Sequence, residues 1–247
     1  MSEAWELARA AARGAGVELR PLTTVDDADR INDVIQATWG GQRLDREVVR
    51  ALAASGNVPW GAFDGDRLIG FVLGWAGIDD EGLHVHSHML AAIPDHRRRG
   101  VGFALKLTQR AQALDQGISV VRWTFDPLVA RNAWLNLGKL GAVVDRFERD
   151  YYGVMTDDLN AGERSDRFMV RWELPRKPGP RTVTVPATEI EIPRDLYELR
   201  RRDPDRARGW RDDVAKAAEA ALARGEVGLA FDRDRSAYVF APRGAAS

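Results

Sequence analysis

Apolar and polar positions along the chain follow two periods, and the changes between them predict the order of its elements. In the stretch 24–38 the apolar side chains recur at i, i+3 and i+4, the spacing of one helix face. In 119–125 they alternate instead, with Val121, Trp123 and Phe125 on one side, as in a half-buried strand. We therefore expect helices and strands to alternate along the first two thirds of the chain.

The full pattern predicts a mixed domain over residues 17–174. The Asp64-Gly65-Asp66 turn between two apolar runs indicates a hairpin. Strands are expected at 17–22, 59–63, 68–77, 83–93, 119–125, 143–149 and 167–174, and helices at 4–15, 24–38, 45–54, 100–116 and 130–140. From residue 17 the order is β-α-α-β-β-β-α-β-α-β-β, which is typical of an α/β (α+β) domain.

A proline-rich stretch, 175–180, predicts a linker after this domain. Beyond it we expect short strands at 183–185 and 189–192, a helix from Asp203 to 224 and a closing hairpin over 227–241. About 70 residues with so few elements seldom form a separate core. We therefore predict a domain at 1–174 and a C-terminal extension (residues 175–247) that packs on it or covers its substrate end.

Composition narrows the function. The net charge is −1 and the chain has no cysteine, so it has neither a global field for nucleic acid nor any disulfide. The arginine run 200–202 is interleaved with acidic residues, as on a solvated, ion-paired helix face, and so are the nearby Arg194, Arg206, Arg208 and Arg211. No apolar run nears the ~20 residues that span a bilayer, and the first residues lack a secretion signal. We expect a cytoplasmic protein without a membrane or nucleic-acid partner.

The stretch from His96 to Lys106 carries the clearest chemistry. It follows a predicted strand, contains Gly100 and Gly102, and opens a predicted helix. No acidic residue occurs between Asp95 and Asp115. Unpaired N–H groups at a helix start, together with the helix dipole, favour a bound anion, and glycine lets a phosphate approach the backbone. The dinucleotide and Walker patterns are both absent.

What remains is Arg97-x-x-Gly100-x-Gly102, which resembles the coenzyme-A-binding turn of the GNAT family, the Gcn5-related N-acyltransferases. The segment 131–142 resembles the family's later motif N-x-x-A-x-x-x-Y-x-x-x-G-F, with Asn132 and Gly141 in place but Leu137 where the tyrosine stands. The resemblance implies a GNAT fold, with a mixed central sheet whose fourth and fifth strands splay. Segments 119–174 are similar to a bacterial branch with an extended C-terminus, some members of which N-acylate amino acids.

The resemblance also implies a co-substrate, acyl-CoA (acetyl-CoA or succinyl-CoA), and no metal. Its pantetheine arm would insert beside the fourth strand, where a backbone N–H polarises the thioester carbonyl. The implied cofactor-binding residues are Leu90, Ala91, Ala92, Arg97, Arg98, Arg99, Gly100, Val101, Gly102, Phe103 and Asn132.

Three histidines, His84, His86 and His88, alternate on the fourth predicted strand and so share a face. Alternate positions lie about 6.5–7 Å apart, which is awkward for three ligands of one zinc ion. By the resemblance, the general base stands at His86, with His88 beside it, and imidazole suits that role. A structural role for these histidines is the alternative. Because Leu137 has no hydroxyl, Tyr151 or Tyr152 is the substitute proton donor, unless the thiolate leaves toward water.

The polar loop 155–167 offers both charge signs. Asp157, Asp158 or Asp166 could hold an acceptor ammonium and Arg167 a carboxylate, although Asx turns explain the aspartates equally well. We therefore expect an acyl-CoA-dependent N-acyltransferase that acts by direct attack on a small-molecule primary amine, such as an amino acid. The alternative is a catalytically silent acyl-CoA-binding sensor or partner protein, which the missing tyrosine favours. A homodimer is left open.

Overall fold

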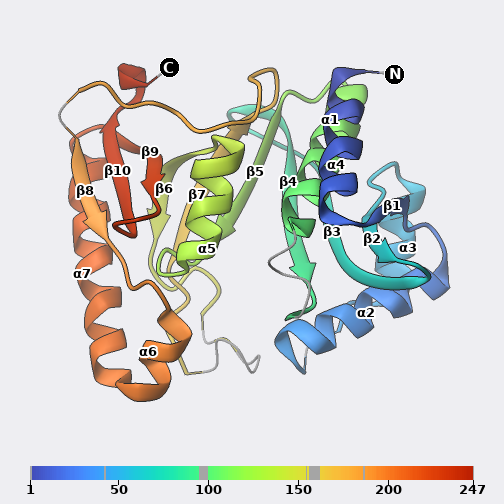
Figure 1. Ribbon diagram of the computed structural model, residues 1–247, viewed down its shortest axis with the longest axis horizontal. Helices are drawn as coiled ribbons and strands as arrows, with labels where there is room; N and C mark the ends of the chain where they lie inside the picture. The colour runs from blue at the N-terminus through green and yellow to red at the C-terminus, as the bar shows by residue number, and fades with distance from the viewer. Residues whose placement is uncertain are drawn as a thin grey trace. The chain divides into compact units, whose positions relative to one another are not determined.

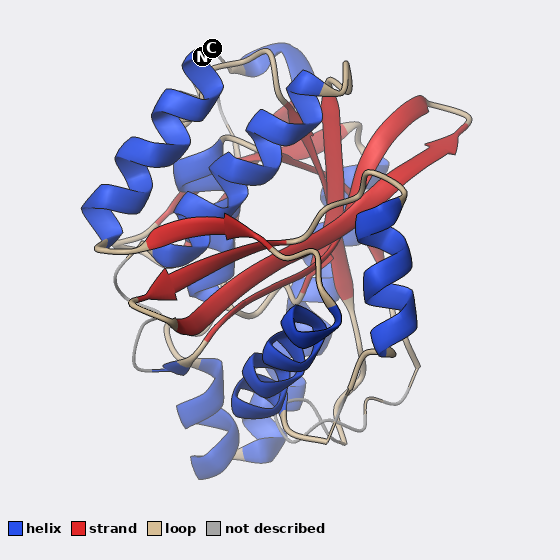
Figure 2. Ribbon diagram, turned by 90° about the vertical axis from the view of Figure 1, so that its right-hand side faces the viewer, coloured by secondary structure: helices blue, strands red, loops and turns tan. Residues whose placement is uncertain are grey.

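The chain divides into two compact units between Val121 and Arg122. The computed structural model describes residues 2–41, 43–94, 100–153, 155, 162–185 and 187–246, and its helices and strands are labelled in Figure 1. Each unit combines strands with packed helices (Figure 2). The boundary predicted after Leu174 is a different division and stays a prediction.

The first unit is built on an antiparallel sheet in the order β1-β2-β3-β4. Its strands are β1 (Glu18–Pro21), β2 (Trp60–Asp64), β3 (Arg67–Asp79) and β4 (Gly82–Ala92). The β2–β3 hairpin turns where the Asp-Gly-Asp signal predicted it. The β3–β4 hairpin pairs Asp79 with Gly82 and is the longest pairing in this unit.

Four helices pack on this sheet: α1 (Glu3–Ala15), α2 (Val25–Trp39), α3 (Arg46–Ala54) and α4 (Val101–Asp115). Thr24 begins α2, because its hydroxyl accepts from the backbone N–H of Asp27 at 3.1 Å while the Asp27 carboxylate accepts from the Thr24 backbone. Helix α1 lies along α4 (Figure 1), and the Trp5 indole N–H donates to the Asp115 carboxylate at 2.6 Å. The two helices therefore run antiparallel.

A bulge interrupts β4 at His88. Gly74 pairs with Ser87 and Leu73 with Met89, so His88 is an extra residue in the ladder. A bulge bends its strand and re-aims the side chains beside it. The regular alternation of β4 therefore ends at His86, although the His88 ring still lies 5.8 Å from that of His86.

The second unit holds strands in the order β5-β7-β6-β9-β10-β8. They are β5 (Val120–Phe125, whose first two residues belong to the first unit), β6 (Val143–Glu148), β7 (Arg167–Glu173), β8 (Thr188–Glu191), β9 (Glu226–Asp232) and β10 (Ala237–Pro242). Val144 of β6 pairs with Gly228 of β9, so the C-terminal extension continues the sheet of β6 and β7. Phe168 is fully buried, with its ring 5.1 Å from that of Tyr238.

The helices of this unit are α5 (Ala130–Ala133), α6 (Leu196–Arg202) and α7 (Pro204–Ala223), with the π-helix η2 (Trp134–Leu140) and the short 3-10 helix η3 (Arg243–Ala245). The single α-helix predicted at 130–140 is therefore wrong after Ala133. Trp134 lies over Gly138, where a Cβ atom would fall 2.2 Å from the indole ring. Asp203 begins α7 as predicted, whereas α6 was not predicted, and Val183 forms only a bridge with Ala246.

Candidate functional site

Two of the β4 histidines meet around one tryptophan. Trp75 of β3 pairs with His86 across the hairpin, and its ring centroid lies 5.0 Å from that of His86 and 4.9 Å from that of His88. The two imidazole rings are 5.8 Å apart. His84 lies nearer the hairpin turn, with Nδ1 3.1 Å from the Gly82 carbonyl oxygen. The structure therefore joins His86, His88 and Trp75 and leaves His84 outside.

The surroundings keep these imidazoles neutral. Burial, and then electrostatic repulsion by His88, His84 and Lys106 in their protonated forms, lowers the pKa of His86 to about 4. Burial also lowers the pKa of His88, although its side chain reaches solvent. Each ring is therefore unprotonated near neutral pH and has a nitrogen that can accept a proton.

A buried lysine supports β4 from the other face. Lys106 of α4 is 1% exposed, and its ammonium donates to the Ser87 hydroxyl at 2.8 Å and to the Gln109 side-chain oxygen at 3.3 Å. Burial lowers the pKa of Lys106 well below its usual range. Since successive strand residues face opposite ways, this contact fixes the strand directly beside His86.

The predicted anion cradle begins at Gly100. This residue caps α4 in the left-handed region, with φ 87° and ψ 6°, a conformation that glycine adopts without strain. Val101 is fully buried, Gly102 and Phe103 lie in the first helical turn, and that turn holds no acidic residue. The predicted contacts Arg97, Arg98 and Arg99 lie outside the described residues.

The backbone of β4 alternates between its two edges. Ala91 pairs with Phe71, and two residues further the Ile93 N–H donates to the Ile69 carbonyl oxygen at 2.9 Å. The peptide groups of Ala91 thus face β3, while those of Leu90 face the opposite edge. Pantetheine contacts at Leu90, Ala91 and Ala92 remain a prediction, and this register favours Leu90 over Ala91.

In the second unit, Asn132 stands at the start of the helical segment after β5. It is partly buried, and its N–H donates to the Val129 carbonyl oxygen at 2.9 Å. Leu137, at the tyrosine position of the family motif, is fully buried in the core. The interpretation of Leu137 as a core residue, without a role at the reacting atoms, fits this burial.

The two candidate proton donors lie together at the surface. The Tyr151 and Tyr152 rings meet edge to face at 4.6 Å, and 38% and 46% of the two residues are exposed. The Tyr152 hydroxyl is 3.2 Å from that of Thr124 at the end of β5. Partial burial raises the pKa of Tyr151, so this phenol keeps its proton at neutral pH.

Of the candidate acceptor-binding residues, Asp157 and Asp158 lie outside the described residues. Asp166 is 1% exposed, and both of its oxygens accept from the Arg164 guanidinium, at 2.6 and 2.8 Å. This arrangement disfavours a contact with an acceptor ammonium. Arg167 is buried too, but its nearest carboxylate, that of Asp126, is 3.9 Å away. Its other contacts are the Asp166 carbonyl oxygen at 2.9 Å and the Met155 sulfur at 3.9 Å.

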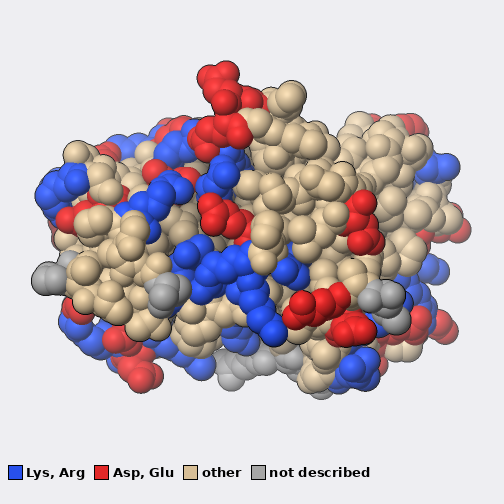
Figure 3. Space-filling model, turned by 90° about the horizontal axis from the view of Figure 1, so that it is seen from above, with Lys and Arg blue, Asp and Glu red and all other residues tan. Residues whose placement is uncertain are grey.

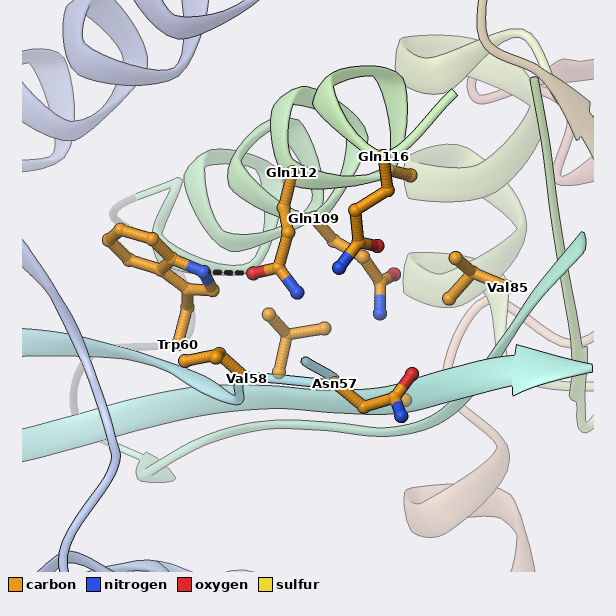
Figure 4. A pocket seen from close by; sticks show the side chains of 10 residues that line it. Asn57, Val58, Trp60, Val85, Gln109, Gln112 and Gln116 are labelled. Atoms are coloured by element: carbon orange, nitrogen blue, oxygen red, sulfur yellow. Dashed lines mark hydrogen bonds between the residues drawn. The ribbon is translucent and has the colours of Figure 1, made fainter. Parts of the chain in front are cut away.

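A small cavity lies between α4 and the sheet of the first unit (Figure 4). Gln109 and Gln112 of α4 line it, together with Gln116 at the C-cap of that helix, and Gly74 and Val85 line it from the strands. Gly74 and Val85 alternate with Trp75 and His86, so the cavity is on the opposite face of the sheet from the imidazole pair. It is separate from the candidate acyl-transfer site.

The described residues contain no group of three or more His, Asp or Glu that could hold a metal ion. In the same part of the chain, no helix combines the length and apolar character needed to cross a membrane. Basic and acidic side chains both occur over the face drawn in Figure 3.

Comparison with known proteins identifies the class. Residues 28–138 match the family model described as "Acetyltransferase (GNAT) family". This part of the chain is a GNAT acetyltransferase domain, and the match indicates an acyltransferase. The predicted α/β GNAT fold is thereby confirmed. No curated protein matches the sequence.

Solved structures share the fold at low identity. The ribosomal-protein-S18-alanine N-acetyltransferase of Escherichia coli is 16% identical, with a TM-score of 0.50 over 64% of this chain and 94% of that one. Naa20 of Chaetomium thermophilum, in complex with a bisubstrate analogue, is 19% identical, with a TM-score of 0.51 over 65% and 88%. The NatC complex bound to Gag peptide and CoA is 16% identical, with a TM-score of 0.50 over 64% and 98%.

Sequence reasoning missed Trp75, Lys106 and Arg211. Trp75 could have been found by counting back from the β3–β4 turn, because the pairing of Asp79 with Gly82 places it opposite His86. Lys106 is the one lysine in the acid-free stretch, but its burial had no local signal. Arg211 was taken as part of a solvated helix face, yet it is 4% exposed.

Proposed function

We propose that this protein transfers an acetyl or succinyl group from coenzyme A to the primary amine of a small, amino-acid-like molecule. Proteins of this family use acetyl-CoA. The observation that carries the proposal is Gly100, which opens α4, the helix that follows β4 in the chain, in a left-handed conformation, with no acid in the first helical turn. A pyrophosphate bound there meets backbone N–H groups and the positive end of the helix dipole.

The imidazoles of β4 supply the base in this proposal. A neutral His86 or His88 accepts the proton of the acceptor ammonium, and the free amine attacks the thioester carbon. The C–N bond forms as the C–S bond breaks, so no enzyme nucleophile takes part. The thiolate takes a proton from Tyr151, Tyr152 or water.

The carboxylate of the acceptor is assigned to Arg167. Burying a guanidinium without a close carboxylate is costly, and the Asp126 carboxylate is engaged at shorter range by Arg211, at 2.9 Å. The Arg167 guanidinium lies 5.3 Å from the centre of the Tyr152 ring, itself partly exposed. A substrate carboxylate would give Arg167 the bidentate partner that it lacks among the described residues.

The test measures coenzyme A release with acetyl-CoA and succinyl-CoA against a panel of amines. We expect release with free amino acids and weaker release with their amides. Arg167→Gln should raise KM for amino acids about tenfold or more without changing KM for amines that lack a carboxylate. Arg171→Gln, four residues further along the same face of β7, is the matched control. If none of the amines in the panel stimulates coenzyme A release, the proposed function is wrong. If free amino acids and their amides are used equally well, only the assignment of Arg167 is wrong.

A further inference from the structure

The C-terminal extension reaches the turn between β5 and α5, residues Asp126–Val129, through two buried side chains. Tyr238 of β10 is fully buried, and its hydroxyl donates to the Pro127 carbonyl oxygen at 2.6 Å. Arg211 of α7 is 4% exposed and donates to both oxygens of the Asp126 carboxylate, at 2.9 and 3.3 Å.

The turn that receives these contacts also has hydrogen bonds of its own. The Asp126 carboxylate also accepts from the Leu128 N–H at 2.9 Å, and the Val129 N–H donates to the Asp126 carbonyl oxygen at 3.2 Å. One oxygen, Oδ1, thus accepts from both Leu128 and Arg211. The guanidinium and the phenol therefore fix the direction in which the chain leaves β5.

The helical segment beyond this turn has contacts with the same extension. The Arg233 guanidinium, from the β9–β10 hairpin, lies 5.6 Å from the Trp134 ring of η2. Arg131 of α5 lies 5.5 Å from the Tyr197 ring of α6. Asn132 lies between Arg131 and Trp134 in the sequence.

We infer that Tyr238 and Arg211 are positioning residues that aim Asn132 at the pantetheine arm of coenzyme A. The inference rests on the proposed function, since it needs the coenzyme to pass Asn132. It assigns the extension a role in cofactor binding. The two donors, Arg211 and Tyr238, lie outside the predicted 1–174 domain, and their acceptors lie within it. Both groups keep the required charge state. Burial raises the pKa of Tyr238 well above its usual value. Burial acts to lower the pKa of Arg211, but the Asp126, Asp166 and Glu163 carboxylates together raise it above its usual value.

The test compares three variants of the full chain by calorimetry with coenzyme A and by steady-state kinetics. Tyr238→Phe removes only the hydroxyl. It should weaken coenzyme A binding about tenfold, the scale of one lost buried hydrogen bond, while KM for the acceptor stays constant. Arg211→Lys keeps the charge but loses the two-point contact, and it should weaken binding in the same direction. Glu219→Gln is the control, because it disrupts the ion pair of α7 with Arg149, the residue after β6, and leaves the turn untouched.

A double variant separates positioning from general destabilisation. If Tyr238 acts through Asn132, then Tyr238→Phe should weaken binding far less when Asn132→Ala is already present. Unchanged coenzyme A affinity in folded Tyr238→Phe and Arg211→Lys overturns the inference, as does full additivity with Asn132→Ala. Should Tyr238→Phe fail to fold, Arg211→Lys decides alone. Wild-type protein that binds no coenzyme A refutes the proposed function itself, and this is measured first.

Discussion

The depressed pKa of His86 predicts a specific dependence of stability on pH. An exposed histidine in the unfolded chain titrates near pH 6.5, whereas His86 in the folded protein titrates near pH 4. Between these values the unfolded chain binds one more proton than the folded one. The free energy of unfolding should therefore be highest above about pH 6.5 and fall as the pH falls toward 4.

The size of the effect follows from the two pKa values. From about pH 7.5 to about pH 4.5, His86 alone removes about 2.5 kcal/mol of stability. Urea denaturation of wild type and His86→Gln over this range isolates that contribution, because every other titrating group is present in both proteins. Wild type should lose about 2.5 kcal/mol more than the variant over the range.

Trp75→Leu provides a second measurement. Loss of the indole ring, 5.0 Å from His86, lets water reach the imidazole, so its pKa should rise toward the ordinary value. NMR titration of the His86 ring protons follows this directly in both proteins. An apparent pKa near 6.5 in the wild type, or equal pH slopes for wild type and His86→Gln, would refute the reasoning.

Three further predictions concern the glycines and the second imidazole. Replacing Gly100 and Gly102 together with valine should abolish coenzyme A binding in calorimetry. Valine is strained at the φ of 87° of Gly100, and a valine side chain at either position blocks the approach of a phosphate to the backbone. Unchanged affinity would contradict the cradle. His88→Gln should lower turnover roughly 10²-fold and flatten the low-pH limb of kcat/KM, whereas full activity would leave this residue a structural role. Gly138→Ala should cost about 1–3 kcal/mol in denaturation, since its Cβ meets the Trp134 ring; a variant as stable as wild type would show that this ring moves freely.

Local signals in the sequence were enough for most of the elements and for the glycine that opens α4. The helix starts at Thr24 and Asp203 follow from side chains that bond the backbone three residues away. Gly100 was identified for the same reason: a glycine between a strand and a helix, without nearby acids, needs no distant partner to be recognised. Interactions between residues that are close in the sequence can be predicted from the local sequence alone.

The tertiary structure decided the rest, because those features depend on partners far along the chain. The bulge at His88 arises from the pairing of β4 with β3, which no periodicity within β4 encodes. The arginine-rich helix α7 was expected to be solvated, and Arg208 does pair within that helix, with Asp205. Arg211 instead pairs with Asp126, 85 residues earlier. Whether a charged side chain is buried depends on whether folding brings it a partner, and the sequence does not show that partner before the chain has folded.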